Sequence, residues 1–189
     1  YNSMGTEVTI VEFQPTIVPV EDKDISKQFE RSLKKAGIKI MTNSSVETVD
    51  TSGTGVKATV KTKKGEENLE ADILLSAVGI KTNIENIGLE DVGIITDRDK
   101  ILVNDWYQTN IPGYYAIGDV TPGPALAHVA SAEGITCVEK IAGLHSEAID
   151  YGNIPGCTYA SPEIASVGLT EEQAKEQGYE LKVGKFPFS

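Results

Sequence analysis

A glycine followed directly by an aspartate, Gly118-Asp119, is the part of this sequence best suited to binding a ligand. A short apolar run from Tyr114 leads into the pair, and a Pro/Gly-rich turn separates it from a helical pattern over 126–141. Glycine lets a ligand approach the backbone, and an aspartate carboxylate accepts hydrogen bonds from polyol hydroxyls. The free N–H groups at the start of the helix favour an anion nearby. We expect a ligand with hydroxyls and phosphate here; the alternative is a strand-turn-helix in which Asp119 only caps a loop.

Two other candidate positions lie where parallel strands are predicted to end. Glu12 closes an apolar run over 6–12, the place where dinucleotide-binding folds put an acid for the adenosine ribose hydroxyls. Gly79 closes the run over 72–78 and would let a ligand reach the backbone. No arginine follows Glu12 closely, and a 2′-phosphate would need such a cation, so a dinucleotide here would be NAD rather than NADP. The alternatives are a solvated strand-end acid and a plain turn glycine.

Composition and charge exclude several classes of function. The chain has 189 residues and a formal net charge of −11, which argues against nucleic acid or an anionic membrane as a partner. The longest apolar run, over 73–80, is too short to cross a bilayer, and no signal peptide is visible. Cys137 and Cys157 lack metal-ligand spacing and are expected to be buried or half-buried free thiols. His128 and His145 favour structural roles, and no metal site is expected.

The first half of the chain follows an α/β pattern. A strand over 6–12 is followed by a Pro-interrupted loop and a helix from Asp22 or Asp24 to Lys35, which Gly37 ends. The next strand, over 38–41, would complete a parallel β-loop-α-β unit. Four further strands are then predicted. Three form a meander of hairpins and the fourth is an apolar strand buried on both faces: 46–50, 55–62, 68–71 and 72–78.

The second half supplies the elements around Gly118-Asp119 and then changes character. A strand over 101–103 and a turn over 109–113 precede the strand and helix at the candidate site, and the loop over 150–156 is a candidate domain boundary. The remainder reads as β-β-α-β, with Thr170 and Gln173 as a capping box that opens its helix. Its three strands are predicted over 157–160, 164–169 and 179–187. The last of them would leave an open edge.

A longer block of sequence around the candidate site carries a family resemblance. The block Thr109-x-Ile-Pro-Gly-Tyr-Tyr-Ala-Ile-Gly-Asp119 resembles the second FAD-binding motif of the flavin disulfide reductases. Its continuation over 123–134 is similar to the dihydrolipoamide dehydrogenase branch of that family. Residues 8–12, 76–79, 159–168 and 183–188 fit the same branch in the same order. The branch comprises homodimeric enzymes that oxidise protein-bound dihydrolipoamide and pass electrons through a disulfide and FAD to NAD.

The resemblance implies a role for nine residues. Asp119, with Gly118 before it, would bind the flavin ribitol, and the start of the following helix would contact the flavin ring through Ala125, Leu126, Ala127 and His128. Glu12 would bind the NAD ribose, Val46 would contact the adenine side, and Gly79 would contact NAD through its backbone. No residue is assigned a catalytic role. Where relatives usually have Arg and then Pro after the glycine, this chain has Ile80-Lys81-Thr82-Asn83.

The resemblance also implies a division of the chain. Residues 1–82 would be the C-terminal part of an NAD-binding domain, 83–150 the returning segment of an FAD-binding domain, and 151–189 the start of a dimer-interface domain. The fold class is α/β: partial doubly wound, Rossmann-like domains with a β-meander, followed by the start of an α+β domain. The chain reads as a fragment cut at both ends. It contains no FAD or NAD glycine motif, redox cysteine pair or histidine-glutamate base, so by itself it is expected to be inactive.

Partners and location follow from the same resemblance. The parent protein would be a homodimer and would act on lipoyl domains of α-keto acid dehydrogenase complexes. It would be cytoplasmic in a bacterium, or in the mitochondrial matrix or a plastid in a eukaryote. Other flavin disulfide reductases, namely glutathione reductase, mercuric reductase and NADH oxidase, are alternatives within the family. A non-catalytic, flavoprotein-like association module, using the open C-terminal strand edge, is the alternative from another class.

Overall fold

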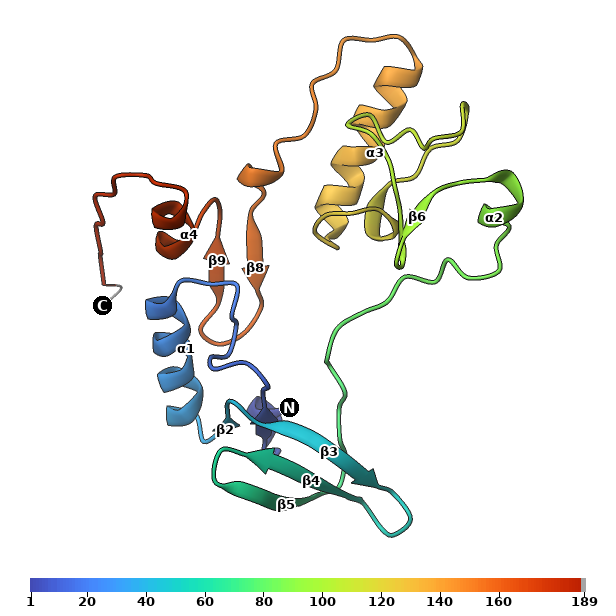
Figure 1. Ribbon diagram of the computed structural model, residues 1–189. Coiled ribbons are helices and arrows are strands. Elements are labelled where there is room, and N and C mark those ends of the chain that lie inside the picture. The colour runs from blue at the N-terminus through green and yellow to red at the C-terminus, as the bar shows by residue number, and fades with distance from the viewer. Residues whose placement is uncertain (188–189) are drawn as a thin grey trace. The chain divides into compact units, whose positions relative to one another are not determined.

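The computed structural model describes residues 1–187, which fold into two compact units (Figure 1). Unit 1 combines residues 1–76 with the chain from Pro155 onward, and unit 2 comprises residues 77–154. Each unit has its own apolar cluster. The predicted boundaries at residues 82 and 150 describe homologous domains rather than compact units, and they stay a prediction.

The β-loop-α-β prediction at the start of unit 1 is confirmed. After a short 3-10 turn, η1 (Asn2–Met4), strand β1 (Thr9–Val11) pairs in parallel with β2 (Lys39–Met41), and helix α1 (Lys23–Lys35) connects them. The helix buries Phe29 and Leu33, which are four residues apart and therefore lie on one face. Gly37 has a φ of 89°, so the chain turns out of the helix where a residue with a Cβ would be strained.

The predicted meander is also confirmed. Strands β3 (Ser45–Asp50), β4 (Val56–Thr62) and β5 (Gly65–Ala71) form an antiparallel sheet in sequence order. The fully buried Val60 anchors the central strand. A register shift between Val46 and Thr48 marks a bulge in β3.

The rest of unit 1 is the chain from residue 155 onward, which packs against α1. Strands β8 (Gly156–Thr158) and β9 (Ile164–Ser166) form a hairpin, and helix α4 (Glu171–Glu176) follows. The predicted capping box is present: Thr170 accepts a hydrogen bond from the Gln173 backbone, and the Gln173 side chain accepts one from the Thr170 backbone. Ile164 joins a buried cluster with Ile17, Phe29 and Leu33.

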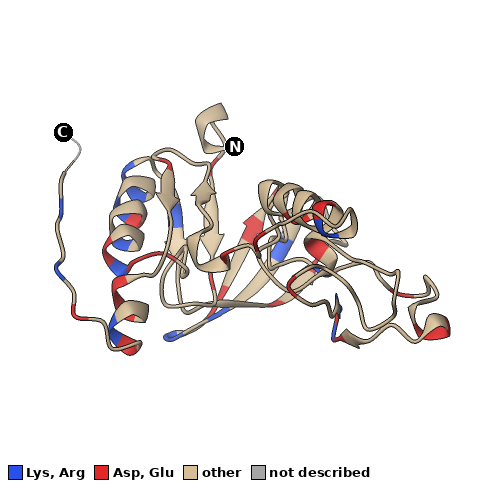
Figure 2. Ribbon diagram, turned by 90° about the horizontal axis from the view of Figure 1, so that it is seen from above, with Lys and Arg blue, Asp and Glu red and all other residues tan. Residues whose placement is uncertain are grey.

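A polar seam beside this cluster ties the first turn of α1 to the later chain. Lys23 lies 2.6 Å from the Glu172 carboxylate, and Lys185 pairs with Asp24. Asp22, the N-cap residue of α1, does not cap that helix; its Oδ1 accepts the backbone N–H of Glu171, at 2.9 Å. Figure 2 shows basic and acidic residues interspersed on the helices of this unit.

We expect Asp22→Ala to lower the free energy of unfolding by about 1 kcal/mol, the usual cost of losing a cap. The reason is that the Glu171 N–H at the start of α4 would lose its acceptor. Urea unfolding followed by circular dichroism measures the change. Asp22→Asn is the matched control because its amide oxygen still accepts; an equal loss in both variants would contradict a capping role.

Unit 2 is built around one long helix and several short elements. They are helix α2 (Leu89–Val92), the hairpin β6 (Thr96–Asp97) and β7 (Lys100–Ile101), the 3-10 turn η2 (Gly118–Val120), helix α3 (Ala127–Ile141) and the 3-10 turn η3 (Tyr151–Asn153). Its apolar cluster contains Ile84, Leu89, Ile101 and Ala116. The predicted helix over 126–141 is thus confirmed, with Leu126 as its N-cap residue.

Three predicted strands are wrong. Residues 72–78 and 179–187 contain no strand, and Tyr115 forms only one isolated bridge, with Gln108. The run over 72–78 is exposed instead of buried, with Val78 96% accessible. A strand requires a neighbour for its backbone hydrogen bonds, and among the described residues no strand pairs with 72–78 or with 179–187. The missing strand over 179–187 also removes the open edge on which the association-module alternative depended; residues 188 and 189 lie outside the described part.

One of the two predictions for the cysteines is confirmed. Cys137 is buried on α3 and both cysteines are free, but Cys157 is exposed rather than buried or half-buried, because it faces outward from a two-stranded hairpin. Within residues 1–187, no helix is long and apolar enough to cross a membrane.

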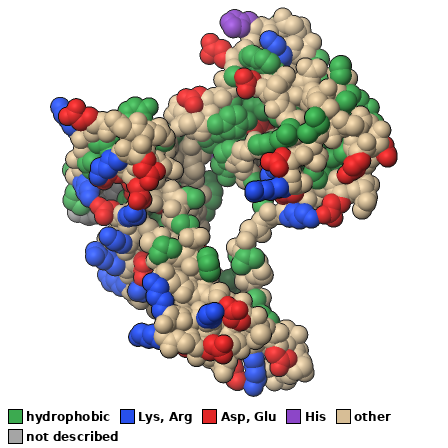
Figure 3. All heavy atoms as spheres, viewed as in Figure 1, with side chains coloured by type: hydrophobic (Ala, Val, Ile, Leu, Met, Phe, Trp, Pro, Cys, Tyr) green, Lys and Arg blue, Asp and Glu red, His purple; other side chains and the backbone are tan. Residues whose placement is uncertain are grey.

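Apolar side chains gather on the visible surface of unit 2 (Figure 3). Large apolar side chains with more than half of their surface accessible on α3 are Ile135, Val138 and Ile141.

Candidate functional site

The Gly118-Asp119 pair forms a tight turn against helix α3. Gly118 has a φ of 73°, which a side chain would strain, and a Cβ there would lie 3.3 Å from the Cβ of Ala130. Gly134 is equally close to the turn, because a Cβ on it would lie 3.2 Å from Cδ1 of Ile117. Small residues at these points let α3 approach the turn closely. Gly118 and Asp119 are the first two residues of the 3-10 turn η2; they do not end a strand.

Two charged side chains hold the backbone of this turn. Glu133, on α3, is only 2% accessible and its Oε2 accepts the Gly118 N–H at 2.5 Å. Lys100, on β7, donates from Nζ to the backbone carbonyl of Asp119 at 2.6 Å. The Asp119 side chain is exposed, and among the described residues its carboxylate has no hydrogen-bond or ion-pair partner. The carboxylate is thus available to a ligand that donates hydroxyl hydrogen bonds.

The start of α3 lies next to the turn in sequence and in contact with it. Its N-cap, Leu126, has no side chain that could cap the helix, and its first turn contains no acidic residue. The positive end of the helix dipole therefore lies at a helix start without a side-chain cap, which favours an anion there. Ala125 and Ala127 are exposed beside Leu126, as is His128. A ligand with hydroxyls on one side and an anionic group on the other suits this arrangement.

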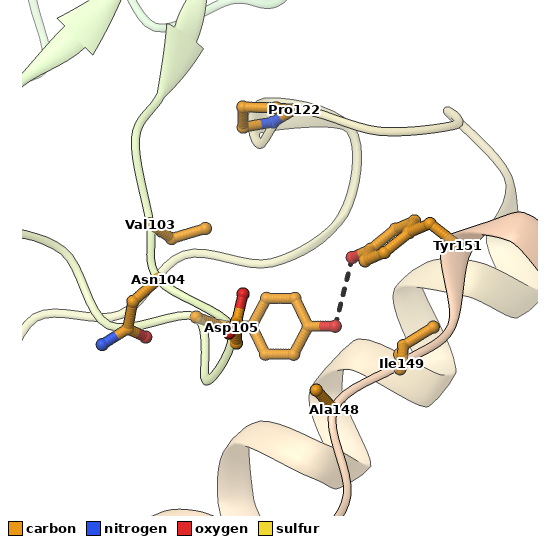
Figure 4. A pocket seen from close by; sticks show the side chains of 8 residues that line it. Val103, Asn104, Asp105, Pro122, Ala148, Ile149 and Tyr151 are labelled. Carbon is orange, nitrogen blue, oxygen red and sulfur yellow. Dashed lines mark hydrogen bonds between the residues drawn. The ribbon is translucent and has the colours of Figure 1, made fainter. Parts of the chain in front are cut away.

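A tyrosine pair extends the network behind Glu133. Tyr151 donates its hydroxyl to Glu133 Oε1 at 2.6 Å, and the hydroxyls of Tyr107 and Tyr151 lie 3.1 Å apart. Figure 4 shows the Tyr151 ring, whose hydroxyl takes part in the hydrogen bond drawn there, beside a hollow of about 160 Å³. The hollow is also lined by Val103, Asn104, Asp105, Pro122, Ala148 and Ile149. A Cβ on Gly123 would come within 3.1 Å of the Tyr151 ring, so this ring packs directly against the turn before α3.

Burial, followed by the hydrogen bond to Glu133, raises the pKa of Tyr151 well above 10. Burial also raises the pKa of Tyr107. We expect two of the seven tyrosines to resist ionisation in an ultraviolet pH titration of the folded protein. Unfolded tyrosine ionises near pH 10 while these two keep their protons, so stability should fall as the pH rises above about 10. Tyr151→Phe should reduce the late-titrating component from two tyrosines to one; seven tyrosines titrating together in the wild type would contradict the assignment.

The residues predicted to bind NAD lie in two units, and the structure gives the surroundings of each. In unit 1, Glu12 follows β1, its backbone N–H bonds to the Met41 carbonyl at 2.8 Å, and its Oε1 accepts the Gln14 N–H at 2.7 Å. Val46 lies on β3 opposite Val60 and is 42% accessible. Gly79 belongs to unit 2, where it has a φ of 118° and open space around its Cα. Each is accessible in part, so all three can meet a ligand.

Comparison with protein families identifies the chain. A model described as pyridine nucleotide-disulphide oxidoreductase matches residues 1–134. The chain belongs to this family. A second model, the dimerisation domain of the same family, matches residues 154–189. The second match begins within two residues of the start of the later part of unit 1, at Pro155.

Similar proteins point to one branch of the family. The chain is 48% identical to dihydrolipoyl dehydrogenase of Rhizobium etli and 50% identical to mitochondrial dihydrolipoyl dehydrogenase 1 of Arabidopsis thaliana, and each alignment covers 100% of this chain. It spans 40% and 38% of their lengths, so it corresponds to less than half of each relative. A leghemoglobin reductase of Glycine max is 49% identical over the same span.

Solved structures show the same fold. LpdA of Mycobacterium tuberculosis superposes with a TM-score of 0.85 at 29% identity, and the match covers 94% of this chain and 38% of that one. The flavoprotein disulfide reductase RclA of Escherichia coli superposes with a TM-score of 0.84 at 28% identity, covering 95% of this chain and 41% of that one. The α/β, Rossmann-like fold class predicted from the sequence is therefore confirmed.

Sequence reasoning missed the residues that support the turn, Glu133, Lys100 and Tyr151. Glu133 left a signal: it occupies a position of the helical repeat that faces the core, since Val129, Thr136 and Cys137 on the same face are all buried. An acid at such a position predicts a buried hydrogen-bonding role. Lys100 and Tyr151 left no comparable signal, because their contacts join residues 19 and 18 positions apart.

Proposed function

We propose that the chain is a segment of a dihydrolipoyl dehydrogenase, an FAD-dependent oxidoreductase that oxidises protein-bound dihydrolipoamide with NAD as the acceptor. The observation that carries the proposal is the 48–50% identity to dihydrolipoyl dehydrogenases along the whole chain. A second observation is the accessible Asp119 carboxylate beside an uncapped helix start. Glutathione reductase, mercuric reductase and NADH oxidase activities are the alternatives within the family.

FAD fits unit 2 through the residues around η2. Asp119 would accept hydrogen bonds from ribitol hydroxyls, Gly118 would allow the ligand chain to approach, and residues 125–128 would lie against the flavin ring. The close packing at Gly118 and the uncapped helix N-terminus support this assignment. When bound, the flavin supplies the two-electron chemistry between a dithiol and a pyridine nucleotide. The residues of this chain bind and orient it.

NAD is assigned to Glu12, Val46 and Gly79. The Glu12 carboxylate would accept hydrogen bonds from the adenosine ribose hydroxyls, Val46 would contact the adenine, and Gly79 would contact NAD through its backbone. Partial exposure of Glu12 at the carboxyl end of β1 supports this assignment. No residue of the chain is assigned as the catalytic nucleophile or base. Cys137 and Cys157 are twenty positions apart, which does not suit a redox-active pair.

The domain division, partners and location extend the proposal. Residues 1–82 would belong to the NAD-binding domain, 83–150 to the FAD-binding domain and 151–189 to the interface domain. The match to a dimerisation domain supports a homodimer, and lipoyl domains of α-keto acid dehydrogenase complexes would be the protein substrates. The relatives include bacterial and mitochondrial proteins, which supports the cytoplasm or the mitochondrial matrix as the location.

The experiment is an assay of the protein purified at the length its source organism makes. Dihydrolipoamide should reduce NAD but not NADP, and the purified protein should show flavin absorbance. Glutathione disulfide and mercuric ion, tested with NADPH, separate the alternative members of the family. Reduction of either one, without dihydrolipoamide oxidation, would overturn the proposal. The 189 residues alone are expected to be inactive, since they contain no closely spaced cysteine pair.

A further inference from the structure

Glu133 is a buried acid that the proposed function does not use. It is 2% accessible and both of its carboxylate oxygens accept hydrogen bonds from neutral donors, the Gly118 N–H and the Tyr151 hydroxyl. A carboxylate buried in this way is costly, and an apolar side chain would fill a core-facing helix position at lower cost. What the carboxylate adds over an apolar residue is a fixed acceptor for one backbone N–H, that of Gly118.

Lys100 acts on the same turn from a different element. Its ammonium donates to the Asp119 carbonyl, whereas the Asp119 carboxylate stays unpaired among the residues described. The lysine therefore binds the backbone of the aspartate instead of its side chain. Together, Glu133 on α3 and Lys100 on β7 hold the first N–H and the last carbonyl of the two-residue segment Gly118-Asp119.

Fixing both ends of this segment fixes the direction of the Asp119 side chain. Gly118 has a φ of 73° and could adopt many other conformations at little cost, so the turn requires external support to keep one shape. Charge-assisted hydrogen bonds are the strongest supports available to a backbone group. A ligand that meets an already oriented carboxylate loses less conformational entropy on binding.

We propose that Glu133 and Lys100 are positioning residues for the flavin nucleotide: they orient the Gly118-Asp119 turn so that the Asp119 carboxylate faces the ribitol hydroxyls. The inference rests on the proposed function, because it takes FAD to be the ligand of this turn. Tyr151 completes the arrangement by occupying the second oxygen of Glu133, and its ring lies against Gly123 at the start of the loop to α3.

The test measures the Kd for FAD in variants of the protein at its natural length. Glu133→Leu removes the acceptor and should raise the Kd by about tenfold or more. Glu133→Gln retains an oxygen acceptor and should recover most of the affinity. The control is Glu139→Leu, the same change elsewhere on α3, which should leave the Kd unchanged. Equal affinities for the wild type and a folded Glu133→Leu variant would overturn the inference.

Lys100 provides a second test that does not disturb the interior. Lys100→Met should raise the Kd for FAD several-fold, and Lys100→Arg should restore it, because a guanidinium can still donate to the Asp119 carbonyl. Lys63→Met is the matched control on an exposed turn of the meander. If Glu133→Leu fails to fold, the lysine pair decides: no difference among Lys100→Met, Lys100→Arg and the wild type would overturn the inference.

A spectroscopic readout separates this inference from the proposed function. In the protein without ligand, the amide proton of Gly118 should resonate downfield in a nitrogen-proton correlation spectrum and should move upfield in Glu133→Gln, which lacks the charge. A wild type that binds no FAD would overturn the proposed function, and the positioning role with it. FAD binding by the wild type, together with an amide shift and Kd values that are unchanged in the variants, would overturn the positioning role alone.

Discussion

Replacing Asp119 with alanine is expected to weaken FAD binding by about 100-fold. A carboxylate that accepts hydrogen bonds from ligand hydroxyls contributes about 2 to 3 kcal/mol, and its removal leaves those hydroxyls without a partner in the complex. The turn itself is held by Glu133 and Lys100 through its backbone, and both contacts would remain in the variant. The loss should therefore appear in the Kd for FAD and not in the stability of the free protein.

The measurement is quenching of protein fluorescence on titration with FAD. Trp106, the one tryptophan of these 189 residues, lies in unit 2, with Lys140 of α3 4.2 Å from its ring centroid. Asp97→Ala makes the same change of charge on the exposed hairpin of this unit and should bind FAD as the wild type does. Asp119→Asn should lie between, because an amide oxygen accepts without charge. A Kd for Asp119→Ala within about threefold of the Asp97→Ala value would show that Asp119 does not contact the ligand.

The elements that the sequence predicted well are those whose signals are local. Helix α1 follows from apolar residues at helical spacing and from Gly37, and the capping box at Thr170 follows from two residues three positions apart. The meander follows from short β-branched runs separated by turn residues. In each case the interactions that stabilise the element join residues close together in the sequence, so the pattern contains most of what is needed.

The elements that the sequence predicted wrongly depend on distant partners. The run over 72–78 has the composition of a buried strand, yet in the structure it is exposed and forms no strand. An apolar, β-branched composition indicates that a segment could form a strand within a sheet. It does not show that another strand is present to pair with it. The same reasoning applies to residues 114–117, where one bridge to Gln108 replaces the expected strand. The sequence placed the Gly118-Asp119 pair at the end of that strand, whereas the structure places it in the 3-10 turn η2.

In the candidate site, too, the residues that are neighbours in sequence could be predicted, and the contacts between residues far apart in sequence could not. Asp119 and the start of α3 could be predicted, since they are neighbours in sequence. The supports could not: the Glu133 contact depends on the exact rotation of α3, and the Lys100 contact depends on where the β6–β7 hairpin lies. That Asp119 and the start of α3 bind a ligand stays a prediction from the sequence, and the structure was needed to identify Glu133 and Lys100 as the residues that hold the turn.

Phe29→Ala is expected to lower the free energy of unfolding of unit 1 by about 3 to 5 kcal/mol. Phe29 is 7% accessible and packs in the cluster that α1 shares with Ile17 and Ile164, so its removal leaves a cavity between the early and late parts of this unit. Domains of this size are stabilised by about 5 to 15 kcal/mol in total, so the loss is a large fraction. Urea unfolding followed by circular dichroism measures it. Ile25→Ala, at a position on α1 that is 45% accessible, should cost less than about 1 kcal/mol.

A double-mutant cycle then tests whether the chain after residue 155 depends on α1 for its packing. Ile164→Ala should itself be destabilising, because it removes a side chain from the same buried cluster. Since both side chains line one cluster, the double variant should lose less than the sum of the two single losses, with a coupling of about 1 kcal/mol. Strictly additive losses of unfolding free energy would mean that the two side chains contribute to stability independently of each other. In that case the polar contacts at Asp22, Lys23 and Asp24, rather than the apolar cluster, would join the chain after residue 155 to the first helix.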